Sequence, residues 1–165
     1  LHSATGEAVS IALQNDVYMQ YIRVIQSTHP LRFVTEEGSM RPLTQSATGW
    51  MLMATHPDKE VERLVRRANI ATPADQVRQP LELMMQRVRE VRTQGWALAE
   101  NIPLLGGATV CVLLPIAAQG RPVVLGLGGT LERIMPQREK LLALMKELAG
   151  QLLVTSQGHP GDSVA

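Results

Sequence analysis

The chain has 165 residues, 45% of them apolar and 19% charged, which is typical of a single folded domain and excludes a disordered chain. The formal net charge of +1 gives no electrostatic support for nucleic-acid binding by this chain alone. One cysteine, Cys111, excludes a disulfide framework, and no apolar run is long enough to span a bilayer, so we expect a cytoplasmic chain without a membrane partner.

The first third of the chain predicts strands. The segments "EAVSIALQ" and "VYMQYIRVI" are rich in β-branched and aromatic residues, and Gln14 to Asp16 between them are turn residues. After Pro30, Leu31 to Thr35 read as a third strand that ends at Gly38. The connections are too short for crossover helices, so we expect an antiparallel meander.

The middle third predicts three helices. Ser46 is placed to cap a helix that runs to about Thr55, and Pro57 begins "PDKEVERLVRRA". The third helix, "PLELMMQRVREVRTQG", should end at Gly95. Its apolar residues recur at helical spacing on one face, and they are Leu81, Met84, Met85, Val88 and Val91.

The last third returns to strands in "WALAEN", "ATVCVLLPIA" and "RPVVLGLGG", the last two joined by the turn "AAQGR". A closing amphipathic helix follows Pro136, and its predicted buried stripe is Leu141, Leu144, Met145, Leu148 and Leu152. The fold class is therefore α+β, with a largely antiparallel sheet of about six strands flanked by helices, in the style of GAF and PAS sensor domains. We expect one domain over residues 1–155 and a disordered tail over 156–165, which is polar and rich in Gly and Pro.

Residues with catalytic or metal-binding chemistry are scattered. The histidines, at positions 2, 29, 56 and 159, have no ligand-like spacing, so we expect no metal site and no cofactor. Cys111 lies in the apolar stretch "TVCVLLP", where burial makes a thiol inert. No catalytic residues are assigned, and the chain is not expected to be an enzyme.

The stretch "SATGW" at Ser46 to Trp50 offers the best case for a ligand pocket. Small residues at a helix start let a ligand approach the unpaired backbone N–H groups, which favour an anion. The glycine-bearing strand "GLGG" could form the opposite wall. On physical grounds alone, tight packing of this helix against the sheet explains the small residues equally well.

Several segments in order resemble the effector-binding domain of IclR-type transcriptional regulators. They are "LHSATGEAVSIAL", "YIRVIQSTHPLRFVTEEGSMRPLTQSATGWMLMA", "ELMMQRVREVRTQGWALAEN" and "GGATVCVLLPIAAQGRPVVLGLGGTLERI". The resemblance implies a domain that binds a small organic or aromatic acid and assembles as a homodimer or homotetramer. It also implies DNA binding only through an N-terminal winged helix-turn-helix domain, which we expect upstream of this chain, since the chain starts abruptly at Leu1.

Carried onto this chain, the family's effector-binding positions include Ala47, Thr48 and Gly49 at the helix start and Cys111 in a strand. Two positions that are often serine in the family correspond to Gly126 and Gly128, and an acidic position of some members falls on Ala99, with Glu100 adjacent. Trp50 replaces the family's usual lysine and is assigned to the pocket, the core or an interface.

The two glycines remove hydroxyl groups, so we hypothesise a roomier and less polar pocket, suited to an aromatic or longer effector. Three alternatives stay open. The chain could be a GAF-like sensor of another signalling protein, or a dimerisation domain that binds no ligand. A small enzyme is the third, and turnover or a substrate analogue bound beside Cys111 or Glu100 would indicate it.

Overall fold

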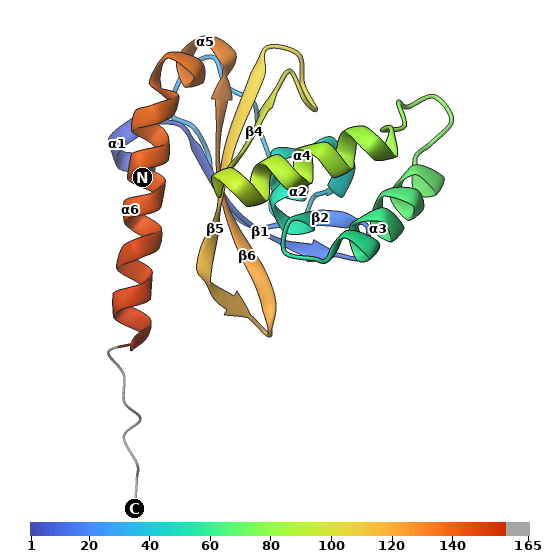
Figure 1. Cartoon of the computed structure of the whole chain (residues 1–165). Coiled ribbons are helices and arrows are strands. Elements are labelled where there is room, and N and C mark those ends of the chain that lie inside the picture. Colours follow the sequence, from blue (N-terminus) through green and yellow to red (C-terminus); the bar gives the residue numbers. More distant parts are fainter. Residues whose placement is uncertain (158–165) are drawn as a thin grey trace, which may run out of the picture.

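The computed structural model describes the backbone of residues 1–157 and the side chains of residues 1–153. Its six strands form one antiparallel sheet in the order β3-β2-β1-β6-β5-β4 (Figure 1). The strands are β1 Ala8–Asn15, β2 Tyr18–Ile25, β3 Met40–Pro42, β4 Ala97–Glu100, β5 Gly107–Ala118 and β6 Arg121–Thr130. The helices are α1 His2–Thr5, η1 Leu43–Gln45, α2 Ala47–Met53, α3 Asp58–Ala71, α4 Leu81–Gln94, α5 Leu131–Ile134, η2 Met135–Gln137 and α6 Arg138–Gln157.

Strand β1 joins the two halves of the sheet, since it pairs with β2 on one side and with β6 on the other. In this register Ala8 lies opposite Gly128 and Ser10 lies opposite Gly126. Residues of β5 continue the row, because Thr109 pairs with Gly128 and Cys111 with Gly126. Small side chains from three adjacent strands thus gather on one part of the sheet. The prediction of an α+β fold with about six strands is confirmed.

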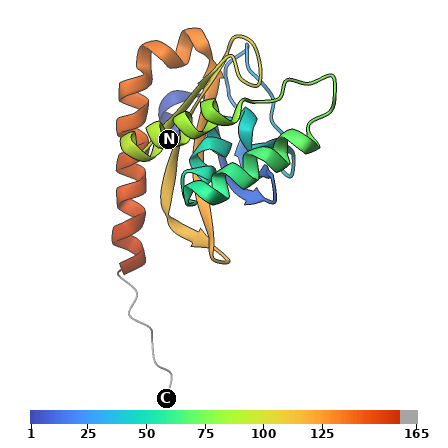
Figure 2. The ribbon, with the colours of Figure 1, turned by 45° about the vertical axis from the view of Figure 1, so that its right-hand side comes forward.

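Helix α6 covers one face of the sheet, where it packs along β5 (Figures 1 and 2). Its buried contacts come from Leu141, Leu142 and Met145, with Leu148 and Leu152 partly buried beside them. The stripe predicted from the sequence is therefore correct except at Leu144, which is only partly buried and lies outside this core cluster. Leu142 takes its place because the helix turns a slightly different face to the sheet.

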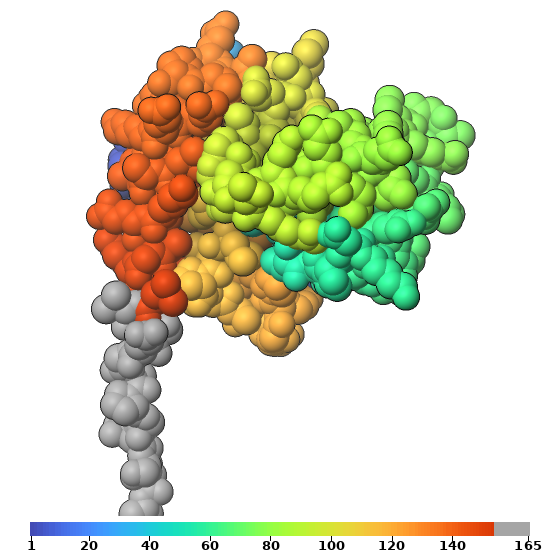
Figure 3. Space-filling view, viewed as in Figure 1, coloured from blue at the N-terminus to red at the C-terminus, as the bar shows by residue number. Residues whose placement is uncertain are grey.

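Helix α2 covers the opposite face, and α3 and α4 pack outside it (Figure 2). All seven residues of α2 are buried, because the helix is enclosed between the sheet and the two outer helices. The space-filling view shows α4 lying across this side of the molecule, with α6 beside it and α3 below (Figure 3). The fold is thus layered, with α6, the sheet, α2 and the α3–α4 pair in succession.

Local signals place the ends of these elements as the sequence predicts. The Ser46 hydroxyl accepts a hydrogen bond of 2.9 Å from the Gly49 N–H and so caps α2. Gly95 ends α4 with a left-handed φ of 77°. The β5–β6 hairpin turns at Gln119 and Gly120, whose φ values of 52° and 74° match the primed turn that a two-residue loop requires.

The third strand is not where the sequence predicts it. Residues 26–39, which we call the strap, form no strand, and β2 is paired instead by Met40–Pro42. Further along β2, the Glu37 carboxylate accepts a hydrogen bond of 3.0 Å from the Val24 N–H. A side chain therefore satisfies this edge donor, and the end of the strap bonds β2 through Gly38 and Ser39, which hydrogen-bond to the Tyr21 backbone.

Two further observations concern the chain ends and membranes. Helix α6 continues to Gln157, so the domain boundary expected after residue 155 falls within a helix, and the remainder of the expected tail, 158–165, lies outside the described residues. Among residues 1–157, no helix combines the length and the apolar character needed to cross a bilayer.

Candidate functional site

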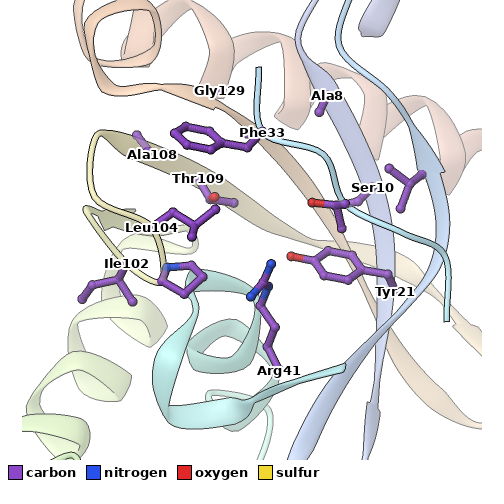
Figure 4. Close-up of a pocket in the computed structure, with 15 residues that line it drawn as sticks. Ala8, Ser10, Tyr21, Phe33, Arg41, Ile102, Leu104, Ala108, Thr109 and Gly129 are labelled. Carbon is purple, nitrogen blue, oxygen red and sulfur yellow. The ribbon is translucent and has the colours of Figure 1, made fainter. Parts of the chain in front are cut away.

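A cavity opens on the α2 side of the sheet (Figure 4). The part of the sheet with small side chains forms its floor, and two loops form its walls. It offers about 70 Å³ of space for the centres of water-sized molecules, which is room for several waters or a small organic molecule. The residues that line it are Ala8, Ser10, Tyr21, Val24, Phe33, Thr35, Arg41, Ile102, Pro103, Leu104, Gly107, Ala108, Thr109, Gly128 and Gly129.

The floor is flat because three strands contribute small residues to it. Ser10 and Thr109 add hydroxyl groups, and Gly128 lies between Ala8 and Thr109 in the sheet register. A Cβ atom at Gly128 would lie 3.4 Å from the Thr109 Oγ1, in ordinary contact. The glycine therefore keeps the floor low without being demanded by the packing, and this leaves room above the strand.

Arg41 is the only charged residue among those that line the cavity. Its guanidinium reaches in from β3, beside the Tyr21 ring from β2 (Figure 4). Burial raises the pKa of the Tyr21 hydroxyl, while the charge of Arg41 and a hydrogen bond with it oppose that rise. No ion pair involves Arg41 among the described side chains. The cavity thus holds one positive charge without a carboxylate to balance it.

Apolar groups form the remaining walls. Ile102, Pro103 and Leu104 enter from the β4–β5 loop, and Phe33 enters from the strap (Figure 4). The Phe33 Cε2 lies 3.3 Å from the position a Cβ at Gly107 would occupy, so the ring closes directly over this glycine. The cavity therefore combines one cation and several hydroxyl groups with an apolar enclosure, which suits a small anion that carries an apolar part.

The residues predicted at the helix start lie beside this cavity, on the same face of the sheet. Ala47 and Thr48 are 1% and 2% exposed, and neither lines it. A Cβ at Gly49 would lie 2.1 Å from the Leu43 carbonyl oxygen, so this glycine is required for contact between α2 and η1. Tight packing accounts for Gly49, as the second interpretation of the stretch proposed.

Thr48 and Cys111 meet next to the floor, two residues along β5 from Thr109, with 3.2 Å between Oγ1 and Sγ. Burial raises the pKa of Cys111 to about 12, and the weaker effect of the Thr48 hydrogen bond opposes it. A Cβ at Gly126 would meet the Ser10 Oγ at 2.9 Å and the Cys111 Sγ at 3.6 Å. The missing side chain of Gly126 therefore leaves no open space, because the Ser10 and Cys111 side chains lie against it. The hypothesis of a roomier pocket is wrong at this position.

Only Gly128 of the predicted site residues lines the cavity itself. Ser10, which does line it, lies with Cys111 and Thr48 around Gly126, each within 3.7 Å of the position that a Cβ there would occupy. Ala99 is buried and pairs with Thr109 in the sheet. Gly128 thus forms part of the floor, and Ala99, Cys111 and Gly126 lie next to the floor in the same sheet.

Glu100 and Trp50 lie at a separate groove between α4 and β4. Glu100 is exposed, whereas Trp50 is 3% exposed and belongs to the core. The Trp50 Nε1 donates a hydrogen bond of 3.1 Å to the Thr44 carbonyl, and the Arg87 guanidinium lies 4.1 Å from the centre of its ring. Of the three readings of Trp50, the core reading agrees with this geometry.

A buried ion pair fixes the end of the cavity near Gly129. The Glu7 carboxylate accepts hydrogen bonds of 2.7 and 3.1 Å from the Arg133 guanidinium. Its Oε2 occupies the space in which a Cβ at Gly129 would lie, at 2.4 Å. The pair ties the start of β1 to α5, and it leaves Glu7 without free charge to offer a ligand. Within the described residues, no group of three His, Cys, Asp or Glu side chains could hold a metal ion.

Arg41, Tyr21 and Phe33 were missed by the sequence analysis. Arg41 stands in a short stretch, "MRP", where no periodic pattern indicates which way it points. Phe33 is the only phenylalanine of the chain, a signal that could have marked it, but its segment was assigned to a strand.

A family model described as "Bacterial transcriptional regulator IclR C-terminal" matches residues 1–153. The chain is similar to the crystal structure of the effector domain of a protein described as the transcriptional regulator IclR from Acinetobacter sp. ADP1. That likeness has 51% identity and a TM-score of 0.86 over 92% of this chain and 88% of the other. A comparison with curated proteins found no match.

More distant structures share the fold. An IclR family transcriptional regulator from Brucella abortus has 18% identity and a TM-score of 0.75 over 92% of this chain. The IclR of Thermotoga maritima has 20% identity and a TM-score of 0.70 over 91% of it. The chain spans only 57% and 63% of the lengths of these two proteins.

Proposed function

The chain belongs to the IclR family of bacterial transcriptional regulators, whose C-terminal domain it matches, and on this premise we propose that it senses a small organic acid bound by Arg41. The observation that carries the proposal is the lone guanidinium in a cavity lined by no acidic residue. Arg41 is half-buried and has no carboxylate partner within the described residues, so a ligand carboxylate would supply one in the planar geometry that arginine favours.

Groups other than Arg41 would also contact the acid. The Tyr21 and Ser10 hydroxyl groups lie on the same side of the cavity as Arg41, and Thr109 lies across the floor (Figure 4). These groups can donate hydrogen bonds to carboxylate or keto oxygens, while Phe33 and Leu104 contact the apolar part. Binding of this kind involves no bond making, and the buried Cys111, protonated at neutral pH, supplies no nucleophile.

The route from the cavity to α2 runs along the surface of the sheet. Ser10 lines the cavity and pairs with Gly126, and the Ser10, Cys111 and Thr48 side chains all lie around this glycine. Thr48 bonds Cys111 and belongs to the first turn of α2. If the acid binds more tightly when α2 is in one position than in another, it shifts the population of molecules toward that position. In a homodimer or homotetramer, such a shift would change the spacing of the DNA-binding domains expected upstream.

The experiment is a calorimetric titration of the chain with a panel of aromatic and aliphatic carboxylates, each beside its neutral amide. Loss of a hydrogen bond to a charged group costs about 1.5–3 kcal/mol, so Arg41→Gln should weaken binding of any active acid by about tenfold or more. Arg121→Gln is the matched control, because it removes the same charge from the exposed β5–β6 hairpin.

We expect acids to bind, amides to bind poorly, and the control variant to behave as the wild type. An acid whose affinity is equal in Arg41→Gln would contradict the assignment of the site. A complete absence of binding across the panel would favour the alternative of a dimerisation domain without a ligand.

A further inference from the structure

The cavity follows the direction of strand β5. Gly107, Thr109 and Cys111 are two residues apart and so share one face of the strand. The Phe33 ring lies over Gly107, and Tyr21, the partner of Arg41, packs against the core cluster that includes Cys111. Four residues of extended chain separate the two ends by about 13 Å. Phe33 and Arg41 therefore stand at opposite ends, as Figure 4 shows.

The two ends differ in what holds them. Arg41 belongs to β3 and is held in the sheet by the pairing of Met19 with Arg41. Phe33 belongs to the strap, which no ladder supports. Its flanking residues Leu31 and Val34 are 72% and 65% exposed, so Phe33 is the apolar side chain of this stretch that turns inward.

The strap is nevertheless anchored before and after Phe33. The Thr28 N–H donates a hydrogen bond of 2.9 Å to the Gly6 carbonyl, and Glu37 accepts one from Val24. The ring is thus held over Gly107 by a short span of chain, and the glycine offers no side chain that could replace the ring as a wall.

We propose that Phe33 is the residue that sets the length of the acid the cavity accepts. The inference rests on the proposed function, because Arg41 must hold the carboxylate end. With that end fixed by charge, a longer acid directs its far end at the ring. A smaller residue at position 33 opens the cavity toward Gly107 and the loop at Leu104, and a larger one shortens it.

The test uses two series of acids on the isolated chain, straight-chain monocarboxylates from propanoate to octanoate and benzoates with para-alkyl groups of increasing length. Dissociation constants are measured by calorimetry for the wild type, Phe33→Ala and Phe33→Trp. Leu31→Ala is the matched control, since it truncates an exposed apolar side chain on the same strap.

One methylene group in an enclosed pocket changes affinity by about tenfold or more. We therefore expect Phe33→Ala to raise the affinity for long acids relative to short ones by at least about tenfold, and Phe33→Trp to shift the preference the other way. The control should keep the order of the wild type. Thermal unfolding of each variant identifies loss of fold, and if Phe33→Ala unfolds, Phe33→Leu must show the same shift to a smaller extent.

An unchanged length order in folded Phe33 variants that still bind through Arg41 would overturn this inference and leave the proposed function standing. If the wild type binds no acid in either series, the proposed function is overturned, and this inference with it. That outcome is read from the wild type alone, so it is distinct from a failure of the Phe33 variants.

Discussion

Arg41 and Tyr21 place polar chemistry in a cavity whose walls are otherwise small or apolar. The burial of Tyr21 raises its pKa, so its hydroxyl stays protonated and can donate a hydrogen bond throughout the neutral range. A guanidinium keeps its charge under all these conditions. The pair therefore presents a positive charge and a hydroxyl group together, and acid recognition depends on these two side chains more than on the helix start beside them.

The burial of Cys111 predicts how the stability of the fold depends on pH. Burial raises its pKa from 9.0 to about 12, so the folded chain keeps a proton that the unfolded chain loses. The stability from this group is complete below pH 9 and is lost as pH rises toward 12, by up to about 1.4 kcal/mol per pH unit. The raised pKa of Tyr21 acts in the same direction above its ordinary value of 10.0.

Urea unfolding at pH 8.0, about 9.5 and about 10.5 measures this effect. Cys111→Ser keeps a hydroxyl partner for Thr48 but has no thiol to ionise, so its free energy of unfolding should fall less over this range, by about 1–2 kcal/mol. Equal declines in the two proteins would show that the thiol is not held in its protonated form.

At the scale of elements, the position of α2 depends on Gly49. Its missing side chain lets the helix lie against η1, where a Cβ would meet the Leu43 carbonyl oxygen at 2.1 Å and the Leu43 Cα at 2.5 Å. Backbone atoms cannot swing aside as a flexible side chain can. Gly49→Ala should therefore destabilise the domain by about 3 kcal/mol or more, at the upper end of overpacking costs.

Gly150→Ala is the matched substitution for this test, because Gly150 lies exposed in α6 with nothing within 4 Å of the added atom. It should be neutral or stabilise the fold by up to about 1 kcal/mol. Denaturant unfolding of both variants gives the comparison, and a Gly49→Ala protein as stable as the wild type would refute the close contact.

The elements that the sequence predicts well are those with strong local signals. The Ser46 cap, the left-handed Gly95 and the β5–β6 hairpin each depend on a few neighbouring residues, and all three are confirmed. The strand predicted at Leu31 to Thr35 was wrong, because the Glu37 side chain takes an edge donor of β2, an event that no local pattern reports.

The candidate site shows the same division. The family resemblance pointed to small residues around Thr48 and Cys111, which do meet, but their burial depends on how α2 packs on the sheet. Arg41 of β3 and Phe33 of the strap line the same cavity as Thr109 of β5, which is far from them along the chain. Such a meeting is set by the strand order and is not visible in the spacing of any motif.

At the scale of the whole molecule, the two faces of the sheet have different roles. Helix α6 and its leucines close one face into a core, while the other face holds both the packed α2–α3–α4 group and the cavity. A ligand in the cavity would lie beside α2 on this face, so small movements of the floor residues would be passed to an enclosed helix. That arrangement suits a regulator domain, since closely packed elements shift between discrete positions more readily than they deform.

The most direct measurement is a crystal structure of the chain with an acid that calorimetry shows to bind. The account predicts the acid in the cavity, with its carboxylate within hydrogen-bonding distance of the Arg41 guanidinium and its apolar end directed at Phe33. An acid found instead in the groove between α4 and β4, or one bound in this cavity with its carboxylate turned away from Arg41, would contradict it.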